Sequence, residues 1–439
     1  MRWYDLFAIV VNFLINPATI LIGGLSVAAG LSFWAAVLAQ TLGCLVSFIA
    51  YVTIATIGVD YGIPGQVATR MTFGLRGAKW GPSFLRIVAS TYWFAFQTIA
   101  GSIVIVQVLD NFLGGHHSLI VVSAIFGVGQ VVVAVWGYGS LKILSRLAFP
   151  LKILILGFLW IELSHTNVAS YHLQNVLHYQ GSINSNWMLF AIWVNSVATG
   201  WIVMITDAAD FCRYSRSRLD MWIGTILAAL VGCLFCTFLG AYAAAATLGA
   251  NPNFFVVVTN VHGDRWTLVA VIVVVVLDDW TINVLNLYTG GLSLSNIFEK
   301  VGRFWTTLAV GVLSVALSTL PSIVSGYLQF TTVLGNLFSP VAGILLADYL
   351  FIRRGHIDVP ALFDRDGPHW YWKGFNPFAV VWTIAGFALY YLIPVNWLQT
   401  FSTIILVGAG YVTSIRIYTT LGHGTWFDRK NYSSINLDS

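Results

Sequence analysis

The stretch NFLINPATILIGG, residues 12–24, places a proline and two asparagines inside a long apolar segment near the start of the chain. Proline lacks a backbone N–H donor and disrupts a helix, so Pro17 would leave carbonyl groups of the preceding turn without helical partners. Asn12 and Asn16 bring amide groups to the same point, and two glycines follow. The stretch therefore predicts a helix that is interrupted part of the way along its apolar length, with polar atoms available at the interruption.

The composition around this stretch is that of a membrane protein. Of the 439 residues, 58% are hydrophobic and only 9% are charged, whereas about a quarter of the residues of a soluble domain are charged. A spanning helix needs about 20 mostly apolar residues, while barrel strands would give short alternating segments. The long continuous apolar runs predict an all-α membrane protein with twelve transmembrane helices, at residues 7–31, 33–58, 84–110, 118–138, 141–163, 188–209, 220–248, 267–294, 304–324, 326–352, 376–394 and 397–418.

The distribution of lysine and arginine predicts the orientation in the membrane, because these residues concentrate in short cytoplasmic loops. If the N-terminus is inside, the cytoplasmic side collects all of the 21 lysines and arginines, Arg86 and Lys152 among them, except Arg265. We therefore expect a multi-pass plasma membrane protein with both termini in the cytoplasm. The net charge of +4 is then a consequence of topology and does not indicate nucleic-acid binding. Residues 1–6 lack the features of a cleaved signal peptide, so the first span is expected to stay.

Further polar groups lie inside the third and sixth predicted spans. Trp93 and Gln97 are spaced i and i+4, so they share one face of a helix. In the sixth span Gly200 and Trp201 precede Asp207 near the cytoplasmic end. A buried amide without a partner costs roughly 1–3 kcal/mol. These side chains are therefore expected to meet a partner in the fold or in a ligand.

The eighth span contains the most polar sequence of any predicted span, VLDDWTINVLNLYTGGLSLSN at residues 276–296. A charged carboxylate at the centre of a spanning helix costs roughly 2.5–3.5 kcal/mol even on a lenient insertion scale. Two carboxylates are followed here by a hydroxyl and two amides, at Asp278, Asp279, Thr281, Asn283 and Asn286. We expect at least one of the carboxylates to have a functional role.

Interruption signals in the first and sixth spans are five spans apart, as are the polar clusters of the third and eighth. Discontinuous helices in corresponding positions of two halves indicate an inverted repeat, with a ligand held near the bilayer midplane. This predicts a five-plus-five architecture with discontinuous helices 1 and 6 and two additional C-terminal helices. The first repeat would span residues 1–163, the second inverted repeat residues 164–352, and helices 11 and 12 with a cytoplasmic tail residues 353–439.

A set of motifs in a specific order resembles the nucleobase:cation symporter family 1, which contains cytosine, purine, allantoin and hydantoin permeases. They are GLSFWAA (30–36), YGIPGQVATRMTFGLRGA (61–78), LRIVASTYWFAFQTIAG (85–101), DAADFCRYSRSR (207–218), SPVAGILLADYLFIRRGHIDVPALF (339–363) and WYWKGFN (370–376). The resemblance covers most of the chain. It implies the same five-plus-five fold and a secondary active transporter that imports a nucleobase or related small planar heterocycle by cation symport.

The resemblance also implies a substrate site. Members of this family hold a flat ring between aromatic residues of helices 3 and 6 while an amide of helix 3 bonds the ring edge. The matching positions are Trp93, Trp201 and Gln97, and Gly200 adds backbone groups beside the aromatic ring. On helix 8 the resemblance implies that asparagines face the substrate, and these correspond to Asn283 and, one residue closer than in the family pattern, Asn286.

The resemblance implies a coupling cation, which we expect to be sodium in preference to protons. The candidate sodium ligands lie on helices 1 and 8, at Asn12, Phe13, Asn16, Asp278 and Thr281. Ile282 stands where the family carries a second hydroxyl, which weakens the case for sodium. The neighbouring carboxylates can bind protons. We expect no other cofactor, and a chain that functions as a monomer in the lipid bilayer.

An intramembrane enzyme with Asp278 and Asp279 as a general acid and base is the alternative interpretation. No HExxH, GxSxG or comparable catalytic motif accompanies these carboxylates. An enzyme of this kind would also give the two tryptophans no role. The sequence favours the transporter, and it does not identify the heterocycle.

Overall fold

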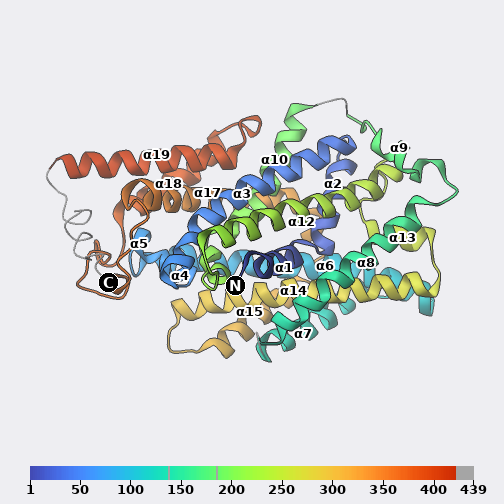
Figure 1. Cartoon of the computed structure of the whole chain (residues 1–439), viewed down its shortest axis with the longest axis horizontal. Helices are drawn as coiled ribbons and strands as arrows, with labels where there is room; N and C mark the ends of the chain where they lie inside the picture. The colour runs from blue at the N-terminus through green and yellow to red at the C-terminus, as the bar shows by residue number, and fades with distance from the viewer. Residues whose placement is uncertain (137–138, 184–185, 422–439) are drawn as a thin grey trace.

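The computed structural model describes residues 1–136, 139–183 and 186–421, and this part of the chain is built from helices (Figure 1). Seven helical segments in it are long and apolar enough to cross a membrane, and an eighth is obtained if the bent pair α1 and α2 counts as one span. The seven are α3 (Phe33–Tyr61), α6 (Phe84–Leu113) with the π-turn before it (Lys79–Ser83), α10 to α11 (Trp187–Cys212), α12 (Arg218–Ala246), α14 (Arg265–Ile297), α17 (Tyr327–Ala347) with its final π-turn, and α19 (Gln399–Thr420). The prediction of an all-helical membrane protein is confirmed.

The remaining predicted spans also contain helices. These are α7 (Leu119–Trp136), α8 (Gly139–Ser164), α15 (Arg303–Leu317) and α18 (Pro377–Leu392). Each of the twelve predicted ranges thus holds a helix, while the number of helices that cross the membrane stays a prediction. Short helices lie in the connections, at α4 (Gly65–Ala68), α5 (Arg70–Phe73), α9 (Leu173–Leu177), α13 (Phe254–Val261) and α16 (Ser322–Ser325).

The first predicted span is broken at the asparagine–proline pair. α1 (Trp3–Leu14) and α2 (Pro17–Ala28) meet at a bend of 57°. Ile15 and Asn16 between them have extended backbone angles, and the Asn16 side chain caps α2 by accepting a hydrogen bond of 2.9 Å from Thr19 N. Pro17 occupies the first position of α2, where its missing N–H donor costs nothing. The local sequence therefore fixes both the position of the break and the start of the second half-helix.

The sixth predicted span changes conformation later than expected. α10 (Trp187–Ile202) continues through Gly200 and gives way to a 3₁₀ segment, η3 (Val203–Asp207), before α11 (Ala208–Cys212). The expected interruption near Gly200 is therefore displaced by about one turn, and it is a tightened turn and not an open break. A 3₁₀ segment inside a helix leaves its backbone groups less well satisfied. Val203 in this segment offers its carbonyl to a side chain of the site described below.

The packing brings the interrupted and polar helices together. α6 and α14 lie along each other, α1 and α2 pack on α12, and α3 packs on α10 and α12 (Figure 1). α7 and α15 cover one side of the α6–α14 pair, and α17, α18 and α19 form a group at the other side of the molecule. The helices that carry the predicted site residues thus occupy the centre of the bundle.

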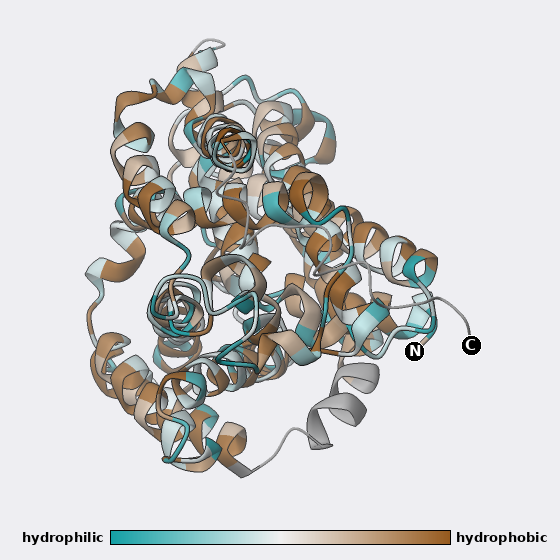
Figure 2. Cartoon of the chain, turned by 90° about the vertical axis from the view of Figure 1, so that its left-hand side faces the viewer, coloured by the Kyte–Doolittle hydropathy of each residue, from teal (hydrophilic) through white to brown (hydrophobic). Residues whose placement is uncertain are grey.

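Glycine permits one of the closest helix contacts at this centre. A Cβ atom on Gly240 of α12 would lie 1.8 Å from the carbonyl oxygen of Ile20 on α2, which no side chain can tolerate. Small residues allow helix backbones in a membrane to approach in this way. The outer helices carry mainly hydrophobic residues, and hydrophilic residues gather at loops and helix ends (Figure 2). This distribution is expected of a bundle surrounded by lipid.

Candidate functional site

A cavity lies among α2, α3, α6, α10, α12, α14 and α17, beside the 3₁₀ segment η3. Five of the six residues predicted to bind substrate line it, namely Trp93, Gln97, Gly200, Trp201 and Asn286. The other lining residues were not singled out as substrate ligands: Ala18, Thr19, Ile22, Gln40, Arg86, Val197, Val203, Met204, Cys233, Ile282, Leu285 and Tyr327. Polar clusters of three predicted spans therefore meet at a single cavity.

The two tryptophans are held by different neighbours. A Cβ atom on Gly200 would lie 3.4 Å from Cζ2 of Trp93, so the bare backbone of α10 faces the Trp93 ring on α6. The Trp201 ring packs on Phe48, with ring centroids 5.5 Å apart, and on Phe13, with centroids 6.5 Å apart. Both indoles are only partly buried and both line the cavity. Each therefore keeps part of its surface available to a planar ligand.

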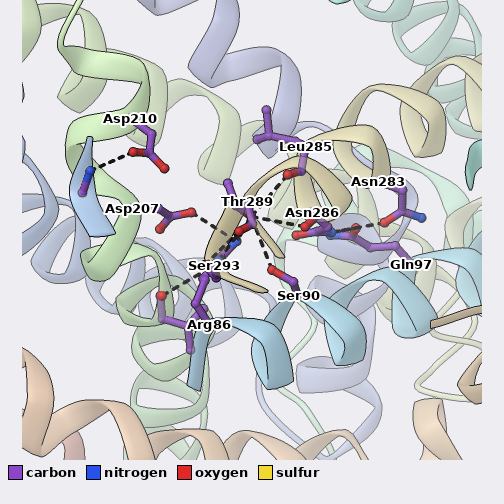
Figure 3. Close-up of polar contacts among 12 residues, drawn as sticks. Arg86, Ser90, Gln97, Asp207, Asp210, Asn283, Leu285, Asn286, Thr289 and Ser293 are labelled. Atoms are coloured by element: carbon purple, nitrogen blue, oxygen red, sulfur yellow. Dashed lines mark hydrogen bonds and ion pairs between the residues drawn. The ribbon is translucent and has the colours of Figure 1, made fainter. Parts of the chain in front are cut away.

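The amide of Gln97 is part of a hydrogen-bonded row (Figure 3). Asn286 Nδ2 donates to Gln97 Oε1 at 2.8 Å and to Asn283 Oδ1 at 3.2 Å. Asn283 Nδ2 in turn donates to Gln130 Oε1 at 2.5 Å and to Thr98 Oγ1 at 3.1 Å. Asn283 does not line the cavity but lies behind Asn286. The row fixes the orientation of the Gln97 and Asn286 amides at the cavity wall.

Gln130 is a member of this row that is not among the predicted site residues. Gln130 lies on α7, in an apolar run with no other amide nearby, and its side chain is fully buried. A solitary buried amide in such a run was the available signal, because it must find a partner. The residue that it meets, Asn283, could not be named without the packing of α7 on α14.

A charged cluster borders the cavity next to η3 (Figure 3). Arg86 of α6 is only 3% exposed and pairs with Asp207 at 3.2 Å. Its guanidinium also donates to Thr289 Oγ1 at 3.0 Å and to the carbonyl of Val203 at 3.3 Å. From the sequence, Arg86 is expected only as one of the cytoplasmic charges. The structure shows that it links three elements around the cavity.

Asp210 of α11 bonds to the backbone of a segment that is distant in the sequence. In the structure Asp210 Oδ1 accepts a hydrogen bond of 2.8 Å from the backbone N–H of Gly65 (Figure 3). Asp210 thus joins α11 to the start of α4.

The candidate cation ligands surround a lysine. Lys152 of α8 is fully buried and forms an ion pair with Asp278. Its ammonium also donates to the carbonyl oxygen of Asn12 at 3.3 Å and to Thr281 Oγ1 at 3.2 Å. The placement of Lys152 among the cytoplasmic charges was therefore wrong. Its position within LAFPLKILILGFLW (147–160), deep in an apolar run, was the signal that it is buried.

The other two candidate cation ligands are used within the break itself. Asn16 Nδ2 donates to the carbonyl oxygen of Phe13 at 2.9 Å and to Thr19 Oγ1 at 2.9 Å. The carbonyl of Phe13 thus already accepts a local hydrogen bond. Three of the five residues proposed as sodium ligands, Asn12, Asp278 and Thr281, thus contact the Lys152 ammonium. Sodium coupling stays a prediction.

The two neighbouring carboxylates face different helices. Asp278 pairs with Lys152 of α8, whereas a Cβ atom on Gly101 of α6 would lie 1.8 Å from Asp279 Oδ2. Both carboxylates are fully buried. An acid and a base that act on one substrate must both reach it. Asp278 and Asp279 do not line the cavity, and each lies against a different helix.

Comparison with known proteins gives a consistent result. Residues 1–414 match the family model for permeases for cytosine/purines, uracil, thiamine and allantoin. The hydantoin permease of Microbacterium maritypicum is 27% identical over 381 residues, which cover 82% of this chain and 75% of that protein. The allantoin permease of Bacillus subtilis is 26% identical over 398 residues, which cover 84% of this chain and 79% of that protein.

Solved structures with a similar fold are transporters. Mhp1, a nucleobase-cation-symport-1 family transporter in a closed conformation with bromovinylhydantoin bound, gives a TM-score of 0.80 at 21% identity and covers 95% of this chain and 93% of that chain. MhsT in complex with L-phenylalanine gives a TM-score of 0.61 at 13% identity, covering 94% of this chain and 99% of that chain. At these identities the likeness concerns the fold.

These relatives are permeases and these structures are transporters, so the protein is a transporter and the interpretation as an intramembrane enzyme is wrong. The family model spans nearly the whole chain, including the cavity and both interrupted helices. The chain belongs to the nucleobase:cation symporter family 1, the permeases for cytosine/purines, uracil, thiamine and allantoin.

Proposed function

We propose that the protein imports a small planar heterocycle across the plasma membrane together with a cation, by alternating access around the cavity. The observation that carries this proposal is the presence of two tryptophans and an ordered pair of amides at one central cavity. The heterocycle would have the chemistry of a nucleobase, hydantoin or allantoin, which are the substrates named for related permeases.

The chemistry of the cavity supports a flat, hydrogen-bonding ligand. Aromatic stacking contributes about 0.5–1.5 kcal/mol beyond the apolar area that it buries. Trp93 and Trp201 supply the aromatic surfaces, and the amides of Gln97 and Asn286 supply donors and acceptors for the ring edge. Trp93 Nε1 is buried without a hydrogen-bond partner among the described residues.

The arrangement of the interrupted helices supports alternating access. The break at Asn16 and the 3₁₀ segment at Val203–Asp207 both adjoin the cavity, and they lie in the first and sixth predicted spans. We propose that residues 1–163 and 164–352 are the two inverted repeats, with residues 353–439 outside them. One group of helices would rock against the other when substrate and cation stabilise an occluded state.

Counterflow in proteoliposomes tests the proposal. Vesicles that contain the purified protein and a high concentration of unlabelled heterocycle are diluted into labelled heterocycle, with cytosine, uracil, hydantoin and allantoin as the panel. At least one member should accumulate transiently, because only a carrier exchanges internal for external ligand. Empty vesicles and vesicles preloaded with a non-planar amino acid are the controls. If every member of the panel enters at the rate of empty vesicles, the proposed substrate class is wrong.

A further inference from the structure

Lys152 lies where two functional helices offer oxygen atoms to a cation. Its ammonium pairs with the carboxylate of Asp278 and donates to Thr281 Oγ1, both on α14, and it donates to the carbonyl of Asn12 on α1. An ammonium group has three N–H donors and no acceptor. Each donor therefore has one oxygen to bond, and the three oxygens come from both sides of the α1–α14 contact.

The break in the first span explains why the Asn12 carbonyl is available. Asn12 is among the last four residues of α1, and the carbonyls of a last helical turn have no partner within the helix. The chain turns away at Ile15 and Asn16 and cannot supply one. A cation beside α1 can satisfy this carbonyl, and the Lys152 ammonium does so.

The oxygen set is also one that suits a hard metal cation. Carboxylate, hydroxyl and backbone carbonyl oxygens are the ligands that such ions take in proteins. Sodium at this place would have to share the oxygens with Lys152 Nζ, which already contacts all three. Two positive charges a few ångströms apart in a region of low dielectric repel strongly. The residues present thus fit an ammonium group and do not fit an additional metal ion.

Two further ionisable groups of the described chain lie close enough to this pair to be affected by its charges, Asp279 on the same helix and Cys236 on α12. Lys152 is 0% exposed, and a lysine cannot reach water from such a position by extending its side chain. Buried ionisable groups of this kind in membrane proteins have functional roles.

We propose that the Lys152 ammonium is a tethered cation that takes the place of a bound sodium ion between α1 and α14, so that substrate binding requires no sodium. The inference rests on the proposed transport function, since it concerns what holds the substrate-binding helices in place. In this scheme the lysine connects the broken first helix to α14 permanently. A sodium-dependent relative would make the same connection only when the ion is bound.

The first test measures sodium dependence of the purified full-length protein. Its melting temperature and its affinity for the heterocycle found by counterflow are measured in sodium chloride and in choline chloride at equal ionic strength. Both quantities should be the same in the two salts, with affinities within about twofold. A sodium-specific rise in melting temperature or a tenfold gain in affinity would overturn the proposal. The melting temperature needs no substrate, so this result stands even if the counterflow panel gives no substrate.

The second test removes the tethered cation. Lys152→Ala leaves the oxygens of Asn12, Asp278 and Thr281 without a cation, so the variant should lose affinity in choline and regain stability or affinity when sodium is added. Lys79→Ala is the control, because Lys79 forms an exposed pair with Glu299. If Lys152→Ala does not fold, Lys152→Met with Asp278→Asn removes both charges together. Wild-type affinity in either variant without sodium would contradict the proposed role.

Discussion

Gln97 of α6 and Asn286 of α14 are joined by a hydrogen bond of 2.8 Å at the wall of the central cavity. Asn286 also bonds to Asn283, which lies outside the cavity (Figure 3). The Asn286 amide is therefore oriented by the protein whether or not a ligand is present. The presence of a polar side chain at position 97 in an apolar span is thereby explained in part by the fold. The same bond leaves a preformed polar edge beside two indoles, which reduces the entropy lost when a ring binds.

Replacement of Gln97 by leucine should weaken heterocycle binding by about tenfold or more, because the ring edge would lose a hydrogen-bond partner. The fold should persist, since Asn286 Nδ2 keeps its bond to Asn283. Ligand affinity and melting temperature are measured on the same purified variant. Gln107→Leu is the matched control, because Gln107 lies on the same helix and bonds Asn260 at an exposed position. An unchanged affinity in Gln97→Leu would show that the Gln97 amide does not bind the ring edge.

Trp201→Ala should abolish measurable binding, whereas Trp201→Phe should retain part of it, because a phenyl ring still offers an aromatic face. The neighbouring Phe48 and Phe13 rings would support either aromatic side chain. Isothermal titration with the best ligand from the counterflow panel measures the difference. Trp187→Ala on the same helix, which is 56% exposed, serves as the control. Equal affinities for the alanine and phenylalanine variants would argue against stacking at this position.

Arg86→Met and Asp207→Leu should each destabilise the protein, while the double variant should recover much of the loss. Removing one member of a buried ion pair leaves an uncompensated charge at a cost of roughly 3–5 kcal/mol, and removing both does not. Melting temperatures of the two single variants and the double variant give the coupling. The exposed pair of Lys79 and Glu299 is the comparison, for which about 0–1 kcal/mol is expected. Additive losses in the Arg86 and Asp207 variants would show that the buried pair is not coupled.

Local chemistry made the first break predictable, because Asn16 and Pro17 determine the cap and the start of α2 without help from distant residues. The position of the second change of conformation was not predictable from Gly200. The helix α10 continues through this glycine. The 3₁₀ turn begins at Val203, whose carbonyl accepts a hydrogen bond from Arg86 of α6. Residues placed by tertiary contacts in this way have no signature within a single segment.

The site was predictable to the extent that single residues are costly in a bilayer. Trp93, Gln97, Trp201 and Asn286 were identified by polarity or by family motif, and all four line the cavity. Lys152 was misassigned because a count of charges by membrane side included it, although it lies in the middle of the predicted span 141–163. Its ion pair with Asp278 joins residues 126 positions apart in the sequence (278 − 152) and is apparent only in the packed bundle.

The predicted orientation can be tested with single introduced cysteines. The four native cysteines are all buried, so they should react slowly with a membrane-impermeant maleimide. His116→Cys, at a fully exposed side chain, should label in intact cells, whereas Lys300→Cys should label only after permeabilisation. Labelling of position 300 but not of position 116 in intact cells would show that the orientation is the reverse of the predicted one.

Asp278→Asn should inactivate transport, because it leaves the buried Lys152 ammonium without its negative partner and disturbs the contact of α1 with α14. If the tethered lysine replaces sodium, the proton gradient is the remaining candidate to drive accumulation. Uptake into sodium-free vesicles should then rise with an inward proton gradient and collapse when a protonophore is added. Asp264→Asn is the matched control, since Asp264 caps the start of α14 through oxygens that asparagine largely reproduces. Accumulation that persists with the protonophore would show that protons do not drive uptake. Wild-type uptake by Asp278→Asn would show that this carboxylate is not required for transport.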